Sequence, residues 1–71
     1  MIHITAGVQE TFTATADTLV QNTSPHTVTF QTDVAEAIWG ELRGAMTLDV
    51  PDGTTVYFKA NHELYLATIE I

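Results

Sequence analysis

Thr11-Phe12-Thr13-Ala14-Thr15-Ala16 alternates threonine with apolar residues, and Thr27-Val28-Thr29-Phe30-Gln31-Thr32 repeats the pattern. Because a β-strand sends successive side chains to opposite faces, this alternation predicts strands with one buried and one solvated face. β-Branched threonine suits the pleated, solvated face, while Phe and Val fill the other. Threonine accounts for 13 of the 71 residues, and these stretches therefore predict an all-β fold.

Turn-forming residues separate these stretches from further short strands. Pro51-Asp52-Gly53 is typical of a tight turn, and 22–26 is typical of a loop, because Pro lacks an N–H donor and Asn and Ser favour turns. The segments with strand-like patterns are 2–4, 9–16, 19–22, 27–32, 46–50, 54–60 and 63–71. We expect 27–32 to return antiparallel to 19–22 as a hairpin and 61–62 to form a two-residue turn. About six or seven short strands at this spacing predict one domain over 1–71, a small antiparallel β-sandwich or barrel.

Residues 33–44 break the two-residue period. Asp33 suits a helix N-cap, Glu36 follows three residues later, and Gly40 or Gly44 can end a helical turn. The apolar residues of this segment recur at helical spacing: Val34, Ala37 and Ile38. The pattern predicts one short helix or helical turn near 33–40.

The charge balance excludes two classes of partner. Arg43 and Lys59 are the only permanent cations, and with nine carboxylates the formal net charge is -7. Nucleic acids and anionic membranes are bound mainly through Lys and Arg, so we expect neither as a partner. No apolar run of about 18 residues predicts a transmembrane helix, and residues 1–5 do not resemble a signal peptide. We therefore expect the protein to act where it is made, or in an assembly formed there.

The small size predicts that the chain oligomerises. A domain of 71 residues buries only about 60% of the surface that its unfolded chain exposes, so it is marginally stable alone. The sequence contains no cysteine, which removes disulfides and thiolate zinc sites as stabilisers. Self-association is the remaining common solution at this size.

The residues that could carry chemistry do not form a recognisable site. His3, His26 and His62 lack partners at metal-ligand spacing, so we read them as loop or exposed strand residues. Asp49 and Asp52 flank Pro51, but two carboxylates fall short of the ~6–8 oxygens that calcium binds. The only serine, Ser24, lies in a loop without a nucleophile-elbow motif. We therefore expect no catalysis, no metal and no cofactor.

Aromatic residues are the candidates for an interface. Trp39 can supply a large contact area to a partner, or it can close one end of the core, and the sequence leaves both open. Tyr57 and Tyr65 can likewise be interface or sheet-face residues. The last segment, 63–71, carries apolar residues on both faces, which predicts a strand covered on both sides by its own fold or by a neighbouring subunit.

Several motifs along the chain resemble those of short structural proteins of tailed bacteriophages. Members of the family tend to open with I-x-x-G-x-x-x-x-x-A, continue with V-Q-N-T-S, and close with V-P-x-G-T-T-V-Y and a final strand. The matching segments here are Ile4-Thr5-Ala6-Gly7, Val20-Gln21-Asn22-Thr23-Ser24, Val50-Pro51-Asp52-Gly53-Thr54-Thr55-Val56-Tyr57 and 66–71. Residues 33–44 depart from the family pattern, which has a Gly/Pro-rich loop there.

The resemblance implies a β-sandwich virion protein, assembled in the host cytoplasm. The expected function is capsid decoration, in which an oligomer, expected to be a trimer, bridges subunits of the major capsid protein or of another virion protein. The expected contact residues are Ile2, Ile4, Trp39, Arg43, Tyr57 and Tyr65, with Ile2 and Ile4 contributing strand pairing to a neighbour. The alternatives are a tail or tail-fibre component of the same virion and a small carbohydrate-binding module.

Overall fold

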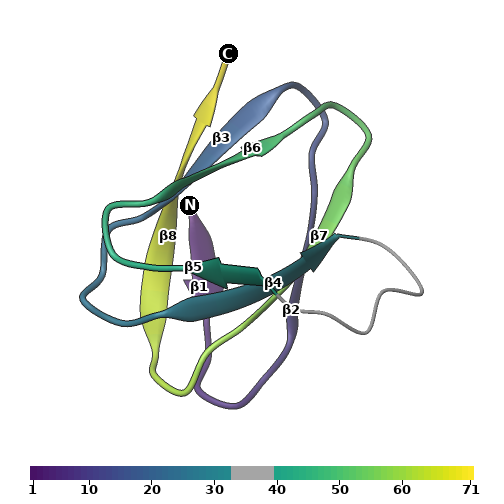
Figure 1. Ribbon diagram of the computed structural model, residues 1–71. Coiled ribbons are helices and arrows are strands. Elements are labelled where there is room, and N and C mark those ends of the chain that lie inside the picture. The colour runs from purple at the N-terminus through teal and green to yellow at the C-terminus, as the bar shows by residue number, and fades with distance from the viewer. Residues whose placement is uncertain (33–39) are drawn as a thin grey trace.

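The described residues, 1–32 and 40–71, form eight β-strands in two four-stranded antiparallel sheets in the computed structural model (Figure 1). The strands are β1 (Ile2–Ile4), β2 (Glu10–Thr13), β3 (Thr18–Asn22), β4 (Val28–Thr32), β5 (Gly40–Leu42), β6 (Thr47–Val50), β7 (Thr55–Lys59) and β8 (Leu64–Glu70). Sheet A has the order β1-β8-β3-β6, and sheet B has the order β2-β7-β4-β5. The all-β sandwich predicted from the alternation is confirmed, with one or two strands more than expected.

The two halves of the chain pair with each other in reverse order. Strand β1 pairs with β8, β2 with β7, β3 with β6, and β4 with β5. The chain is thus one long hairpin that is rolled up, and two further pairings, β3 with β8 and β4 with β7, complete the sheets. This strand order is the jelly-roll arrangement of two Greek keys. Apart from β4 and β5, consecutive strands lie in opposite sheets.

The rolled arrangement contradicts the expected hairpin. Strands β3 and β4 lie in different sheets, so the residues between them cross the sandwich and do not form a hairpin turn. Residues 60–63 also cross the sandwich, from β7 in sheet B to β8 in sheet A. The two-residue hairpin turn expected at 61–62 is therefore not formed either. The turn at Pro51 is confirmed, because the N–H of Thr54 donates to the Pro51 carbonyl at 3.0 Å.

The short helix predicted near 33–40 is not seen. Residues 33–39 lie outside the described part of the chain, and the described residues contain no helix. Gly40, one expected end of that helix, is instead the first residue of β5 and lies opposite Phe30 of β4. A Cβ at position 40 would lie 2.7 Å from the Phe30 ring, so the glycine makes room for the aromatic side chain across the strand pair.

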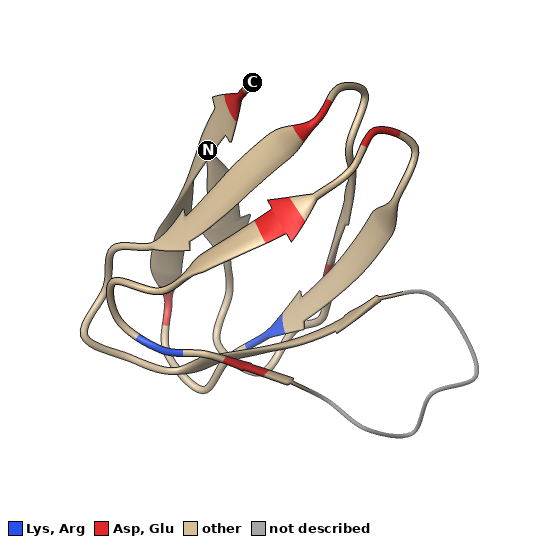
Figure 2. Ribbon diagram, turned by 45° about the horizontal axis from the view of Figure 1, so that its top comes forward, with Lys and Arg blue, Asp and Glu red and all other residues tan. Residues whose placement is uncertain are grey.

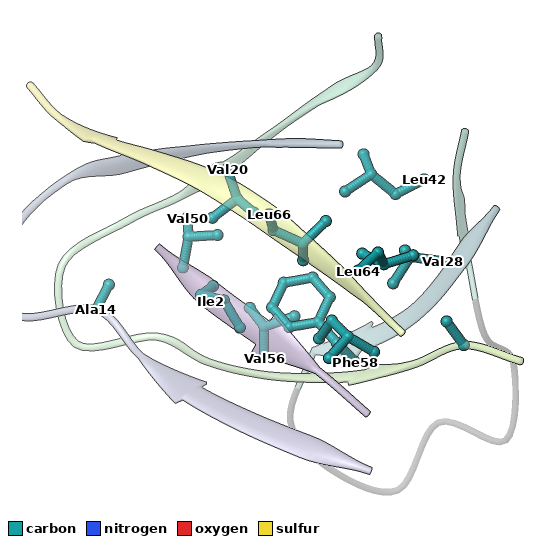
Figure 3. Packing of buried hydrophobic residues seen from close by; sticks show 12 residues of the cluster. Ile2, Ala14, Val20, Val28, Leu42, Val50, Val56, Phe58, Leu64 and Leu66 are labelled. Carbon is teal, nitrogen blue, oxygen red and sulfur yellow. The ribbon is translucent and has the colours of Figure 1, made fainter. Parts of the chain in front are cut away.

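Inward-facing residues of both sheets fill one hydrophobic core (Figure 3). The largest fully buried apolar side chains are Phe58, Ile4, Leu42 and Leu66, and β3 alternates buried and half-buried residues along its whole length. In β2, Thr11 and Thr13 are exposed while Phe12 packs against the core. The alternation in the sequence therefore identified the two faces of this strand correctly.

A buried asparagine ties the two sheets together at one end of the sandwich. The side-chain amide of Asn22 donates to the carbonyl oxygens of His26 and Leu42, both at 2.7 Å. Its Oδ1 accepts from the Ser24 N–H at 3.0 Å and from the Ser24 hydroxyl at 2.7 Å. Both amide hydrogens and both lone pairs of the side chain are thus used, which a buried amide requires if it is not to destabilise the fold.

The backbone of Asn22 holds the turn between β5 and β6 in the same way. Its N–H donates to the Met46 carbonyl at 3.1 Å, and its carbonyl accepts from the Ala45 N–H at 2.7 Å. Ala45 takes a positive φ of 68° to make this contact. Gly44 lies so close to the other loop that a Cβ there would be 2.9 Å from the Ser24 carbonyl oxygen.

We predict that Asn22→Asp strongly destabilises the protein. The substitution replaces two donors with a carboxylate oxygen that faces the His26 and Leu42 carbonyls, so the free energy of unfolding should fall by about 3 kcal/mol or more. Urea denaturation followed by circular dichroism measures the change. The exposed neighbour Thr23 gives the control, because Thr23→Ala should stay within about 0.5 kcal/mol of wild type. Equal stabilities of the two variants would contradict this role of Asn22.

We predict opposite effects at two adjacent positions of the β5–β6 turn. Ala45→Gly relieves the positive φ and should stabilise the fold by about 0.5–1 kcal/mol. Gly44→Ala places a methyl group against a backbone carbonyl and should destabilise it by about 1–3 kcal/mol. Thermal melts of both variants test the pair, and a stabilising Gly44→Ala would show that the turn is packed differently.

Candidate functional site

The outer surface of sheet A carries an uncovered apolar strip. In β8, Leu64 and Leu66 point into the core, so Tyr65, Ala67 and Ile69 point outward. Tyr65 is 52% exposed and Ile69 is 59% exposed. We define the sheet A face as His3, Leu19, Tyr65, Ala67 and Ile69. Large apolar side chains that stay this exposed on a sheet are typical of a contact surface.

Neighbouring strands extend and border this strip. The register places His3 of β1 opposite Tyr65 and Leu19 of β3 opposite Ile69. The rings of His3 and Tyr65 stack with centroids 4.6 Å apart, and Nε2 of His3 lies 3.2 Å from a carboxylate oxygen of Glu63. On the other side, Asp49 of β6 lies opposite Leu19. An apolar centre with a charged rim is the usual anatomy of a protein interface.

The outer surface of sheet B has the opposite chemistry. It presents hydroxyl, amide and charged groups, which we define as the sheet B face: Thr11, Thr13, Thr29, Gln31, Glu41, Thr55, Tyr57 and Lys59. The hydroxyls of Thr13 and Thr55 are 2.9 Å apart. Tyr57 lies between Thr11 and Gln31 in the register and is half-buried. Because these groups can hydrogen-bond to water, the sheet B face can remain exposed to solvent in the free subunit.

The structure separates the interface residues expected from the sequence. Tyr65 belongs to the sheet A face, whereas Tyr57 lies on the sheet B face, on the other side of the sandwich. Arg43 follows β5 and pairs with Glu41 at 3.2 Å. One rigid partner surface therefore cannot contact both tyrosines of the same subunit, and Trp39 lies outside the described residues.

Ile2 and Ile4 of the first strand can contribute to an interface only through their backbone groups. The side chains of Ile2 and Ile4 are 7% and 0% exposed and form part of the core. Strand β1 is an edge strand of sheet A, so one row of its backbone groups faces away from β8.

Leu19 belongs to the sheet A face and was missed by sequence reasoning. The only signal for it was its alternation with buried Val20.

The histidines and Ser24 have structural partners. The rings of His26 and His62 stack at 3.8 Å, although they are far apart in the sequence. The Ser24 hydroxyl donates a hydrogen bond to the Asn22 side chain. The Asp17 carboxylate accepts a hydrogen bond from the Asp52 N–H at 2.9 Å.

Within residues 1–32 and 40–71, no group of three or more His, Cys, Asp or Glu side chains is placed to hold a metal ion. No helix in this part of the chain is long and apolar enough to cross a membrane.

Acidic residues lie at both ends of the sandwich, whereas the two cationic residues lie toward one end (Figure 2). The register and a hydrogen bond bring Asp17, Asp49, Asp52 and Glu70 to the end where β8 finishes. Since the chain matches no protein-family model, no curated protein and no solved structure, the geometry of these surfaces carries the functional argument.

We predict that the sheet A face is not needed for folding. Because their side chains are mostly exposed, Tyr65→Ser and Ile69→Ser should each change the free energy of unfolding by less than about 1 kcal/mol. Leu66→Ala, on the inner face of the same strand, should cost about 2–5 kcal/mol. Urea denaturation compares the three variants. Similar losses at positions 66 and 69 would mean that the outer face is packed within the subunit.

Proposed function

We propose that the chain is a non-catalytic structural subunit of a tailed bacteriophage virion, a capsid decoration protein that assembles as a trimer and bridges adjacent capsid subunits. The observation that carries the proposal is the apolar sheet A face of this acidic jelly roll. The resemblance of the sequence motifs to phage structural proteins supports it. Jelly rolls also occur among viral capsid domains, which fits the proposal but is shared with lectins and cupins.

Burial of the sheet A face would supply both affinity and stability. Apolar surface contributes about 25 cal/mol per Å² when it leaves water, and aromatic residues are enriched among the strongest contacts of interfaces. Tyr65 and Ile69 are the largest exposed apolar side chains of this face. A domain of 71 residues gains stability whenever its folded form binds a partner, since binding draws the equilibrium away from the unfolded chain.

The partner under this proposal is the major capsid protein or another virion protein. The carboxylates gathered at one end of the sandwich favour a basic surface there, and the apolar strip favours a dry contact beside it. A tail or tail-fibre position in the same virion would use the same face. The two locations differ only in which component of the particle binds the protein.

We predict that the chain sediments with heads assembled from the major capsid protein encoded in the same genome, and that Tyr65→Ser/Ile69→Ser stays in the supernatant. The double variant loses the apolar contact, so the bound fraction should fall at least about tenfold. Thr11→Ser/Thr13→Ser on the sheet B face is the matched control and should bind like wild type. Light scattering of the free protein tests the trimer separately.

Three results would decide against this assignment. Density on purified tails but not on heads would move the protein to the tail. Equal binding of the two double variants would exclude the sheet A face as the contact. Failure of the wild-type protein to bind heads or tails would overturn the virion proposal.

A further inference from the structure

A small hollow opens beside the sheet B face. It has a volume of about 250 Å³ and is lined by Thr27, Thr29, Lys59, Ala60 and Asn61. One wall comes from β4 and the residue before it, and the other comes from the end of β7 and the two residues after it. The volume lies just below the roughly 300–1,000 Å³ of pockets for drug-sized ligands, so it suits a ligand with a single ring.

The two walls of the hollow are fixed to each other. The Thr29 hydroxyl donates to the Lys59 carbonyl at 2.8 Å across the β4–β7 pair. Directly beside the hollow, the stacked rings of His26 and His62 join the loop before β4 to the loop after β7. A site that is held in shape before the ligand arrives loses less conformational entropy on binding.

The hollow contains Lys59, which forms no ion pair with another residue of the described part of the chain. The ion pairs among the described residues are His3–Glu63 and Arg43–Glu41, and neither involves Lys59. The five lining residues include no carboxylate. Asp17, Asp49, Asp52 and Glu70 lie where β8 finishes, and Glu41 is separated from Lys59 by strand β4, at two strand spacings or about 9.6 Å. A negatively charged group can therefore approach Lys59 locally, although the whole chain is acidic, because salt screens charges beyond about 8 Å at physiological ionic strength.

We infer that the hollow binds a carboxylate-bearing sugar unit of an acidic polysaccharide. The ammonium of Lys59 pairs with the carboxylate, while the Thr27 hydroxyl and the Asn61 amide can donate to and accept from the ring hydroxyls. Phosphate sites in proteins typically use arginine forks or arrays of backbone N–H groups at a helix N-terminus. A lysine ammonium also binds phosphate as a point charge, so it is the neighbouring hydroxyl and amide groups, which match ring hydroxyls, that favour a sugar carboxylate.

Tyr57 extends the site along the strand. It lies on the same outer face of β7 as Lys59, and two residues of a strand separate them by about 6.6 Å. Thr11 and Gln31 flank Tyr57 in the register and add a hydroxyl and an amide. An aromatic ring with polar neighbours can stack against the next sugar unit, so the site suits a chain of sugars better than a single unit.

The test is a titration of the ¹⁵N-labelled protein with glucuronate, followed by amide chemical shifts. We expect saturable shifts at residues 27–29 and 59–61, and at least about tenfold weaker binding of glucose, which lacks the carboxylate, and of acetate, which lacks the ring. Lys59→Met should weaken glucuronate binding by about tenfold or more. Arg43→Met is the matched control, since it removes the other cation and should leave the affinity unchanged.

Further probes separate this site from its alternatives. Tyr57→Ser should weaken binding of a diglucuronate several-fold and leave the monosaccharide unaffected. Asn61→Asp places a carboxylate in the hollow and should abolish binding while the amide spectrum stays folded. Absence of saturable shifts, equal affinity of Lys59→Met and wild type, or inorganic phosphate binding as tightly as glucuronate would each overturn the assignment. Because the capsid contact uses the sheet A face, this result is independent of the proposed function.

Discussion

The two sheets depend on one buried amide for their connection at the end of the sandwich. Asn22 ends β3 in sheet A, yet its side chain bonds to the carbonyl of Leu42 in sheet B and to the loop that leads into β4. Its backbone bonds fix the β5–β6 turn as well. Burial of apolar side chains stabilises the contact between the two sheets but is not directional. Hydrogen bonds are directional, so those of Asn22 determine which loops pack against each other. Two of the crossings between the sheets at this end, from β3 to β4 and from β5 to β6, are therefore held by a single residue.

The alternation of threonine with apolar residues was sufficient to predict the all-β class and the inward or outward direction of side chains such as Phe12 and Thr13. It could not predict strand partners, because a period of two determines the faces of a strand and not its neighbours. The expected hairpin before β4 failed for this reason. The loop signal at Asn22 was correct, but its meaning was missed, since asparagine is as common in exposed turns as in buried hydrogen-bond networks.

For the candidate surfaces too, the sequence indicated properties of single strands but not the contacts between distant segments. The apolar pattern on both faces of the last strand predicted that Tyr65 lies on a face covered by the fold or by a neighbouring subunit, whereas Leu19 joins this face only through the register of β3 with β8. Tyr57 and Tyr65 looked equivalent in the sequence but lie in different sheets. The hollow at Lys59 was not predictable, because its walls come from residues 27–29 and 59–61, which the pairing of β4 with β7 brings together.

The position of β8 has a consequence for how the chain folds during synthesis. This strand is near the C-terminal end of the sequence but lies between β1 and β3 in sheet A, and the Met1 ammonium group donates to the Thr68 hydroxyl at 3.0 Å. Sheet A lacks one of its two central strands until β8 has left the ribosome, so β1 has no partner and β3 is paired only with β6. Topologies dominated by such distant pairings fold slowly and expose strand edges to aggregation. On the outer face of these two open strands, His3 and Gln21 are polar, which lowers that risk while the chain is incomplete.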